Sequence, residues 1–234
     1  FQPLSLGSRE VSNRMVVHPM EGFDANPDGS PGDLTRRRYS RFARGGSSII
    51  WFEATSVCAE GRSNPHQLYL HEKNVGEFKS LVEMTRKEAR DASDSGQGII
   101  CLLQLTHSGR YSRPGSRPQP LAAAANPHLD RMFQSVRILS DDELDGIGRD
   151  FFKAAVLAEE AGFDGVDIKA CHGYLVNDLL GAHTRPGRYG GDLPGRTRFL
   201  LDAVKTVREE LPGLLCAVRL SAFDGLPFPY GFGV

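Results

Sequence analysis

The chain has 234 residues, a formal net charge of -1 and 40% hydrophobic residues, which is the composition of an ordinary globular domain. The near-neutral charge argues against a nucleic-acid partner, which would require a basic surface. No segment of the sequence has the roughly 18 consecutive apolar residues of a transmembrane helix. The cysteines are widely spaced, which favours free thiols in a reducing, cytoplasmic compartment, and their spacing from the histidines matches no zinc pattern. They are Cys58, Cys101, Cys171 and Cys216.

Segments typical of strands and helices alternate along the first part of the chain. Apolar residues at 14–17 predict a first strand, residues 34–44 have a helical composition, and residues 48–52 predict a second strand. Apolar residues at helical spacing then predict a helix over residues 75–92. The continuous apolar run at 98–105 predicts a strand that is covered on both faces of its sheet.

The same alternation returns after an irregular segment. Residues 111–137 are rich in Pro, Arg and Ala and have no period, which predicts an excursion over one end of the sheet. Ser140 and Glu143 have the spacing of a capping box and predict a helix that runs to about residue 161. The remaining expected elements are a strand at 166–168, a helix at 196–210 and a strand at 214–220.

This order of elements implies parallel strands joined by right-handed crossovers. No GxGxxG loop follows the first strand, and Gly45-Gly46 precedes a strand, so a dinucleotide-binding fold is disfavoured. Periodicity alone does not separate a closed barrel from an open sheet. A barrel has eight strands and about five are counted here, so about three β/α units of a barrel would be absent. Both ends of the chain are interpreted as cuts in a longer protein.

Polar side chains lie where two predicted strands end. Lys169, His172 and Tyr174 follow one apolar strand, and Gln104 lies near the end of another. In a parallel barrel the catalytic groups lie at the carboxyl ends of the strands, so this placement predicts an enzyme. An ammonium and an imidazole converging there would bind a carbonyl or carboxylate oxygen. A tyrosine hydroxyl beside them could donate a proton to a developing carbanion.

Each of these residues also has an ordinary structural explanation. Lys169 could be a surface lysine, His172 a half-buried histidine and Tyr174 a packing residue at the rim. The amide of Gln104 suits a ring with alternating C=O and N–H groups, or a bond to nearby backbone. Arg219 is a charged residue in a core strand, where burial requires a partner. That partner would be an anion, an electron-rich ring or a structural salt bridge.

Six stretches of the sequence, in the same order, resemble those of the Old Yellow Enzyme family of flavin-dependent ene-reductases. They are NRMVVHPM at 13–20, QLTHSGR at 104–110, AGFDGVDI at 161–168, HGYL at 172–175, RYGG at 188–191 with RxRF at 196–199, and VRLS at 218–221. The resemblance extends from residue 1 to about residue 221. It implies an α/β fold, a TIM barrel truncated to about its first five β/α units, so residues 1–234 would be one incomplete FMN-binding domain.

The resemblance also implies which residues contact the flavin. Pro19 and Met20 would line it, and Ala54 would lie beside its reactive edge. Gln104 would hydrogen-bond its pyrimidine ring. Arg219 would lie near its N1/O2 side, where a positive group stabilises the anionic reduced flavin.

On the substrate side, the resemblance implies that His172 holds a carbonyl oxygen and Tyr174 delivers a proton opposite the hydride. The hydride would pass from NAD(P)H to FMN and then to an activated C=C bond of an enone, an enoate or a dienoyl thioester. Two positions depart from the family pattern. Lys169 stands where the family has a second histidine, which would favour carboxylate- or thioester-like substrates. Glu21 stands where it has Thr or Cys, at the O4/N5 edge of the flavin, and a carboxylate there would disfavour reduction unless it is protonated or turned away.

Two other functions stay open at this point. The first is a Schiff-base lyase or aldolase of the barrel class that uses Lys169 as its amine. The second is an inactive barrel fragment that acts by association through an open sheet edge. The expected partner is a small-molecule substrate, with no nucleic acid and no membrane, and formation of a homo-oligomer stays open.

Overall fold

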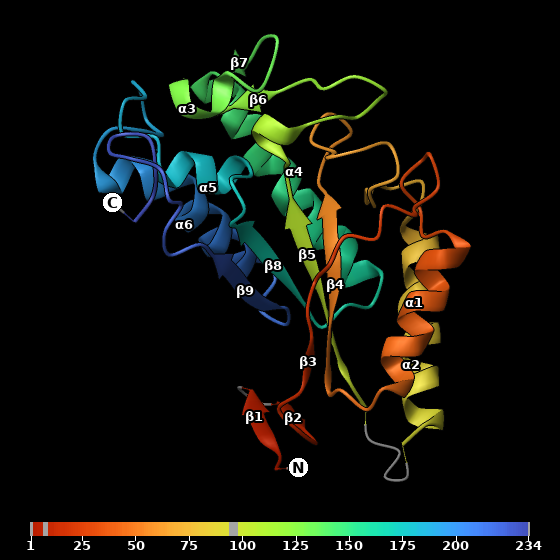
Figure 1. The fold of residues 1–234 in the computed structure, drawn as a ribbon. Coiled ribbons are helices and arrows are strands. Elements are labelled where there is room, and N and C mark those ends of the chain that lie inside the picture. The colour runs from red at the N-terminus through yellow and green to blue at the C-terminus, as the bar shows by residue number, and fades with distance from the viewer. Residues whose placement is uncertain (1, 7–8, 94–97, 234) are drawn as a thin grey trace.

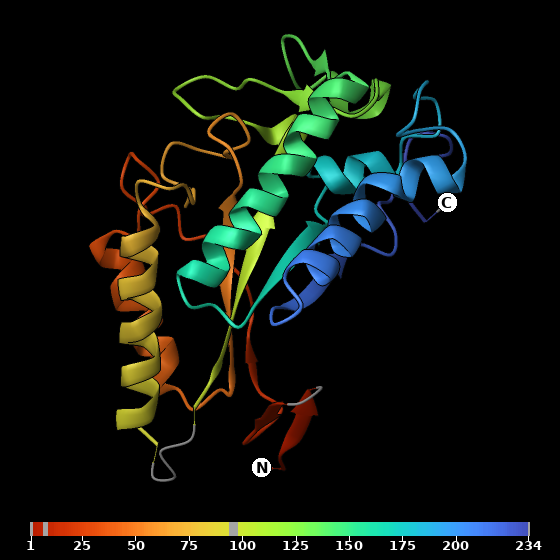
Figure 2. The same cartoon turned by 180° about the vertical axis from the view of Figure 1, so that it is seen from behind.

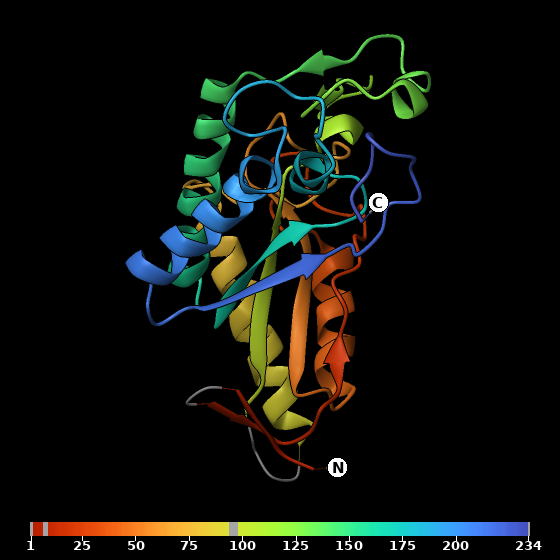
Figure 3. The same cartoon turned by 90° about the vertical axis from the view of Figure 1, so that its left-hand side faces the viewer.

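The computed structural model describes residues 2–6, 9–93 and 98–233. Its centre is a sheet of five parallel strands in the order β3-β4-β5-β8-β9. The strands are β3 (Val16–Val17), β4 (Ile49–Ser56), β5 (Ile100–Thr106), β8 (Gly165–Ala170) and β9 (Leu215–Leu220). In Figure 3, β8 and β9 cross β4 and β5 at an angle, so the sheet curls in the way that the wall of a barrel does.

Long helices cover the outer face of this sheet. They are α1 (Asp33–Arg44), α2 (Val75–Asp91), α4 (Asp141–Glu160) and α6 (Leu193–Glu210). Figure 2 shows α2, α4 and α6 lying along the sheet from one side. Buried strand residues such as Phe52, Leu103 and Ile168 belong to the same core cluster as Phe78 of α2 and Phe151 of α4. The strand runs are therefore apolar because this face is covered by helices.

The inner face has a separate apolar cluster near the amino ends of the strands. A two-stranded antiparallel hairpin, β1 (Leu4–Leu6) and β2 (Arg9–Val11), lies at that end of the sheet (Figure 1). Val11 of the hairpin is in one buried cluster with Ile49, Ile100 and Leu102, and Trp51 packs against it. The hairpin thus helps to cover the apolar floor on the inner side of the sheet.

Short elements gather at the carboxyl ends of the strands, at the top of Figure 1. They are the 3-10 helix η1 (Gly109–Tyr111), β6 (Leu121–Ala122), α3 (Pro127–Asp130), β7 (Arg137–Ile138) and α5 (Leu175–Leu180). Three of them, β6, α3 and β7, form the excursion that the sequence predicts for residues 111–137. Its pairing of β6 with β7 could not be read from a segment without a period.

The parallel α/β alternation is confirmed, and so is the capping box. The Ser140 hydroxyl accepts a hydrogen bond from the Glu143 backbone N–H, and the Ser140 N–H donates to the Glu143 carboxylate at 2.8 Å. One prediction was wrong in a way that matters for the site. Strand β8 continues through Ala170, so Lys169 lies within the strand and not in the turn after it. The hairpin β1–β2 and helix α5 were not predicted. Among the described helices, none is long and apolar enough to span a bilayer.

Candidate active site

The register of the sheet places three of the predicted residues on one face. Gln104 on β5 pairs with Asp167 on β8, and Lys169 on β8 pairs with Arg219 on β9. Side chains alternate between the two faces of a strand, so Asp167 and Lys169 share a face, and their cross-strand partners share it too. It is the inner face, because the indole N–H of Trp51 donates to Asp167 Oδ2 at 3.1 Å.

The Gln104 amide is fully buried, and only its NH2 group forms a hydrogen bond with the described residues. Its NH2 group donates to Asp167 Oδ2, whereas Gln104 Oε1 and Asp167 Oδ1 have no hydrogen-bond partner among the described residues. Burial raises the pKa of Asp167, and the hydrogen bond from Gln104 opposes this. A buried carbonyl oxygen without a donor is uncommon in folded proteins. Gln104 Oε1 is therefore suited to accept a hydrogen bond from an N–H group of a ligand.

Lys169 and Tyr174 meet at the carboxylate of Glu21. The Lys169 Nζ lies 3.0 Å from Glu21 Oε1, and the Tyr174 hydroxyl donates to the same oxygen at 3.1 Å. The Lys169 Nζ also lies 3.7 Å from the centre of the Tyr174 ring. The hydroxyl of Ser63 donates to the other Glu21 oxygen at 2.9 Å. The two positions that depart from the family pattern, 21 and 169, thus contact each other.

The surroundings of Tyr174 and His172 set their protonation. Burial raises the pKa of the Tyr174 phenol well above its ordinary value, and the neighbouring Glu21 carboxylate raises it further. Burial lowers the pKa of His172, and the cationic Lys169 and Arg219 lower it further. At neutral pH the site therefore holds a protonated phenol and a neutral imidazole.

His172 lies in the turn after β8. Its backbone has a φ of 64°, in the left-handed region that a non-glycine residue rarely adopts. It lines a cavity of about 260 Å³, and its neighbours there include Tyr111, Phe223 and Tyr230. Lys169 is 3% exposed and Gln104 is fully buried. His172 is therefore the residue of the group that opens toward a space for a small molecule.

The remaining predicted flavin contacts lie around the same end of the sheet. Arg219 is partly buried and has no ion pair or side-chain hydrogen bond in the described part of the chain. Pro19 is buried and Met20 is 73% exposed in the segment after β3. Ala54 is fully buried where the pairing of β4 with β5 is irregular, and its carbonyl accepts from Gln67 at 3.0 Å. Their contacts with a flavin stay predictions.

In the part of the chain that the structure describes, one group of metal-ligand residue types lies elsewhere, on Cys58, Glu60 and His107, with ligand atoms within 4.8 Å of one another. The His107 Nδ1 accepts a hydrogen bond from the Gly109 N–H at 3.0 Å, so the proton of the neutral ring is on Nε2. Neither nitrogen then has a free lone pair for a metal. Burial also raises the pKa of the Cys58 thiol to about 12. This arrangement does not suit a metal ion.

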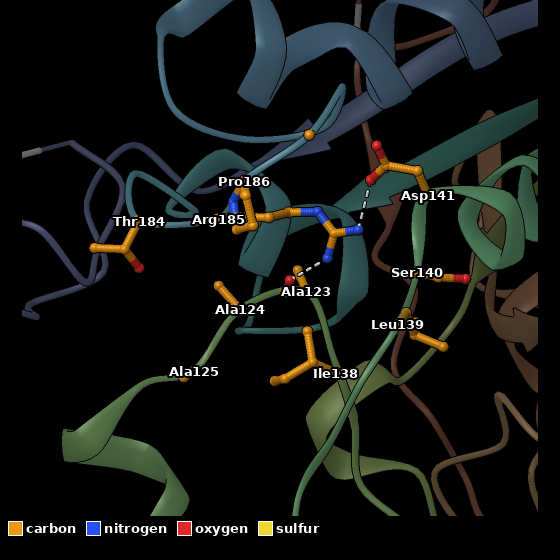
Figure 4. Close-up of a pocket in the computed structure, with 11 residues that line it drawn as sticks. Ala123, Ala124, Ala125, Ile138, Leu139, Ser140, Asp141, Thr184, Arg185 and Pro186 are labelled. Atoms are coloured by element: carbon orange, nitrogen blue, oxygen red, sulfur yellow. Dashed lines mark hydrogen bonds and ion pairs between the residues drawn. The ribbon is translucent and has the colours of Figure 1, made fainter.

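A cavity of about 590 Å³ lies apart from the predicted site residues, between segments 123–125, 138–141 and 184–187. Figure 4 shows the Arg185 side chain reaching Asp141, and the two form an ion pair at 2.7 Å. Arg185 also donates to the carbonyl of Ala123. None of the residues predicted for catalysis or flavin binding lines this cavity.

Comparison with known proteins decides the family. Residues 1–227 match the sequence model of the NADH:flavin oxidoreductase / NADH oxidase family. The chain belongs to this family. Its relatives include NADPH dehydrogenases of Bacillus cytotoxicus, 30% identical over 231 residues, and of Clostridium acetobutylicum, 32% identical over 231 residues. These alignments cover 97% and 96% of this chain but 63% and 64% of the relatives, so the chain spans less than two thirds of their length.

Solved structures of the family agree. Morphinone reductase in complex with tetrahydroNAD is 30% identical, with a TM-score of 0.80 over 100% of this chain and 65% of that one. The Old Yellow Enzyme from Pichia sp. AKU4542 has a TM-score of 0.84 over 99% of this chain and 61% of that one, and at 24% identity it supports the fold alone. The resemblance to the Old Yellow Enzyme family and the truncated TIM-barrel fold are both confirmed.

Sequence reasoning missed three residues of the site, Trp51, Ser63 and Asp167. Asp167 had a usable signal, because it is a carboxylate in an apolar strand and lies two positions before Lys169, on the same face. Trp51 and Ser63 had none that distinguishes them from packing or loop residues. Only the tertiary contacts with Asp167 and Glu21 bring them to the site.

Proposed function

We propose that this chain carries the active site of an FMN-dependent oxidoreductase that takes a hydride from NAD(P)H and passes it to an activated C=C bond. The observation that carries this proposal is the meeting of Gln104, Lys169, Tyr174 and Arg219 around the carboxyl end of one barrel sheet. Membership of the NADH:flavin oxidoreductase family supports the cofactors. Relatives named NADPH dehydrogenase, and morphinone reductase solved with tetrahydroNAD, support reduced nicotinamide as the hydride source.

The residues present fit FMN. Gln104 offers a buried oxygen that receives no hydrogen bond from the described residues, and the pyrimidine ring of a flavin offers an N–H. Arg219 offers a guanidinium that forms no ion pair with a carboxylate of the described residues, which suits the charge of a reduced flavin. When bound, FMN supplies the acceptor and donor of the hydride. Gln104 would orient its pyrimidine edge, and Arg219 would stabilise negative charge on it.

The substrate side follows from His172 and Tyr174. The neutral imidazole of His172 has one N–H, which would donate to the carbonyl oxygen of the substrate and draw electron density from the C=C bond. One carbon of that bond receives the hydride, and the other takes the hydroxyl proton of Tyr174. The raised pKa of Tyr174 keeps this proton in place until a basic carbanion develops. The substrates in view are an enone, an enoate or a dienoyl thioester.

A Schiff-base lyase is less well supported. An amine nucleophile must lose its proton, and burial usually helps a lysine to do so. In this site the Lys169 Nζ already donates to Glu21 Oε1 at 3.0 Å and lies against the Tyr174 ring, so it is not presented to a substrate carbonyl. Failure to trap a carbonyl compound on Lys169 with borohydride would agree with this argument.

FMN binding and half-reactions test the proposal. FMN mixed with the protein is expected to stay bound through desalting, to lose its yellow band on anaerobic addition of NADPH, and to regain it with 2-cyclohexenone. Gln104→Ala is expected to weaken FMN binding, since the orienting acceptor is removed. Release of all FMN on desalting, or a yellow band that NADPH does not change, would reject the function.

A cytoplasmic location belongs to the same proposal and is supported by four free thiols.

A further inference from the structure

The ammonium of Lys169 is buried with its own counterion. The side chains of Lys169 and Glu21 are 3% and 10% exposed, and their charged atoms are 3.0 Å apart. An unpaired charge at such a depth is costly, whereas a paired and hydrogen-bonded one is tolerated. Lys169 therefore does not need an anion from outside the protein.

The carboxylate of Glu21 is fixed in this position from several sides. One oxygen takes the Lys169 and Tyr174 donors, and the other takes the Ser63 hydroxyl. The next residue is held as well, because the Gly22 N–H donates to the buried carboxylate of Glu53 at 2.7 Å. Glu21 is thus not a loose side chain that could turn away when a ligand arrives.

The neighbouring cation has a different status. Arg219 is the cross-strand partner of Lys169 and is half-buried, but it forms no ion pair with a carboxylate of the described residues. Under the proposed function its charge faces the flavin. The charge of Arg219 would thus serve the cofactor. The charge of Lys169, which lies nearest to Tyr174, is already paired with Glu21.

We propose that Glu21 and Lys169 form a neutralised buried pair that makes this site select uncharged carbonyl substrates over carboxylates. This inference rests on the proposed function and narrows its substrates to enones and thioesters. A substrate carboxylate next to Tyr174 would approach the carboxylate of Glu21 and find no free ammonium. Glu21 and Lys169 together thus act as specificity-determining residues, and the charge of Lys169 alone does not decide the substrate.

Two probes of equal shape and different charge test this, trans-cinnamamide and trans-cinnamate. Calorimetry on the FMN-loaded protein is expected to show the amide bound at least about tenfold more tightly than the carboxylate. Glu21→Gln frees the ammonium, so the carboxylate should gain at least about tenfold in affinity while the amide changes by less than about threefold. Adding Lys169→Met to Glu21→Gln should remove that gain.

Glu10→Gln is the matched control, because it removes one negative charge from an exposed position of β2 and should leave the ratio of affinities unchanged. Equal affinity of the wild-type protein for both probes overturns the proposal, and this comparison needs no variant to fold. An unchanged ratio in folded Glu21→Gln overturns it as well. Calorimetry needs no turnover, so a protein that keeps the ratio but reduces no C=C bond refutes the proposed function and leaves the charge selection supported.

Discussion

Tyr174 shows how two neighbours set the chemistry of one side chain. Its hydroxyl donates to Glu21, and the ammonium of Lys169 lies against its ring. Burial and the carboxylate raise the pKa of the phenol, so the proton is held firmly in the resting site. Once the proton has left, the nearby ammonium would stabilise the phenolate that remains. Glu21 thus stabilises the protonated phenol of Tyr174, and Lys169 would stabilise the phenolate.

Substitution Tyr174→Phe removes the proposed proton donor and little else, since the ring remains. We expect the oxidative half-reaction, in which the C=C bond is reduced, to slow by about two to four orders of magnitude. Reduction of the flavin by NADPH should be nearly unchanged, because Tyr174 gives no proton in that step. Stopped-flow absorbance measures both rates, and an equal loss in the two would contradict the proton-donor role.

Among the elements, helix α4 has the most clearly encoded beginning. Its capping box uses the Ser140 hydroxyl and the Glu143 carboxylate reciprocally. The backbone hydrogen bond from Ser140 and the side chain of Arg137 lower the pKa of Glu143 to about 2. The helix then supplies Leu144, Ile147 and Phe151 to the core that covers β5 and β8. The start of α4 therefore supports the strands that carry the site.

The capping box should make stability depend on pH. We expect Ser140→Ala to lower the free energy of unfolding by about 1 kcal/mol at neutral pH.

The folded-state pKa of Glu143 lies below its ordinary value of 4.5. The unfolded state therefore binds more protons than the folded state in the window from pH 4.5 down to about 2. Its contribution is present above that window and is lost as the pH falls through it. Urea unfolding should show that the free energy of unfolding falls less with acid in Glu143→Gln than in the wild-type protein. An equal fall in the two proteins would contradict the role of Glu143.

At the scale of the whole molecule, the described sheet has strands β3 and β9 at its two edges. The outer face of β9 is poorly covered, with Val218 38% and Leu220 52% exposed. Their partners on β8, Ile168 and Ala170, are fully buried. An exposed apolar face beside a free strand edge favours association between chains.

This 234-residue chain is therefore expected to self-associate as its concentration rises, and Leu220→Lys should reduce the effect. A charge on the exposed outer face of β9 opposes contact with another chain but leaves the folded core intact. Leu201→Lys is the matched control, because Leu201 is 60% exposed on α6. Light scattering over a concentration series measures the mass. A chain that stays monomeric throughout, or equal effects of the two substitutions, would contradict the assignment to β9.

Local sequence determined much of the fold because it depends on short-range patterns. The apolar run of β5, the helical spacing in α2 and the capping box of α4 each specify their element within a few turns or residues. The order of these elements implied parallel strands, and ordered motifs identified the family. Because parallel strands bring their carboxyl ends to one edge, the order of the elements predicted that Gln104, Lys169 and Arg219 lie near that edge. The register of the strands then placed them on one face.

Only the tertiary structure decided which side chains pair there. Glu21 and Lys169 are 148 positions apart, and no pattern in either segment indicates that they touch. Taken separately, Glu21 predicted an unfavourable negative charge at the flavin, and Lys169 predicted a cation that binds an anionic substrate. Coulomb interaction depends on the distance between charges in space, and that distance is set by the path of the segment after β3 and by the extra length of β8. The sequence therefore determined that charged residues lie at this edge of the sheet, and the fold decided that the charges of Glu21 and Lys169 pair with each other.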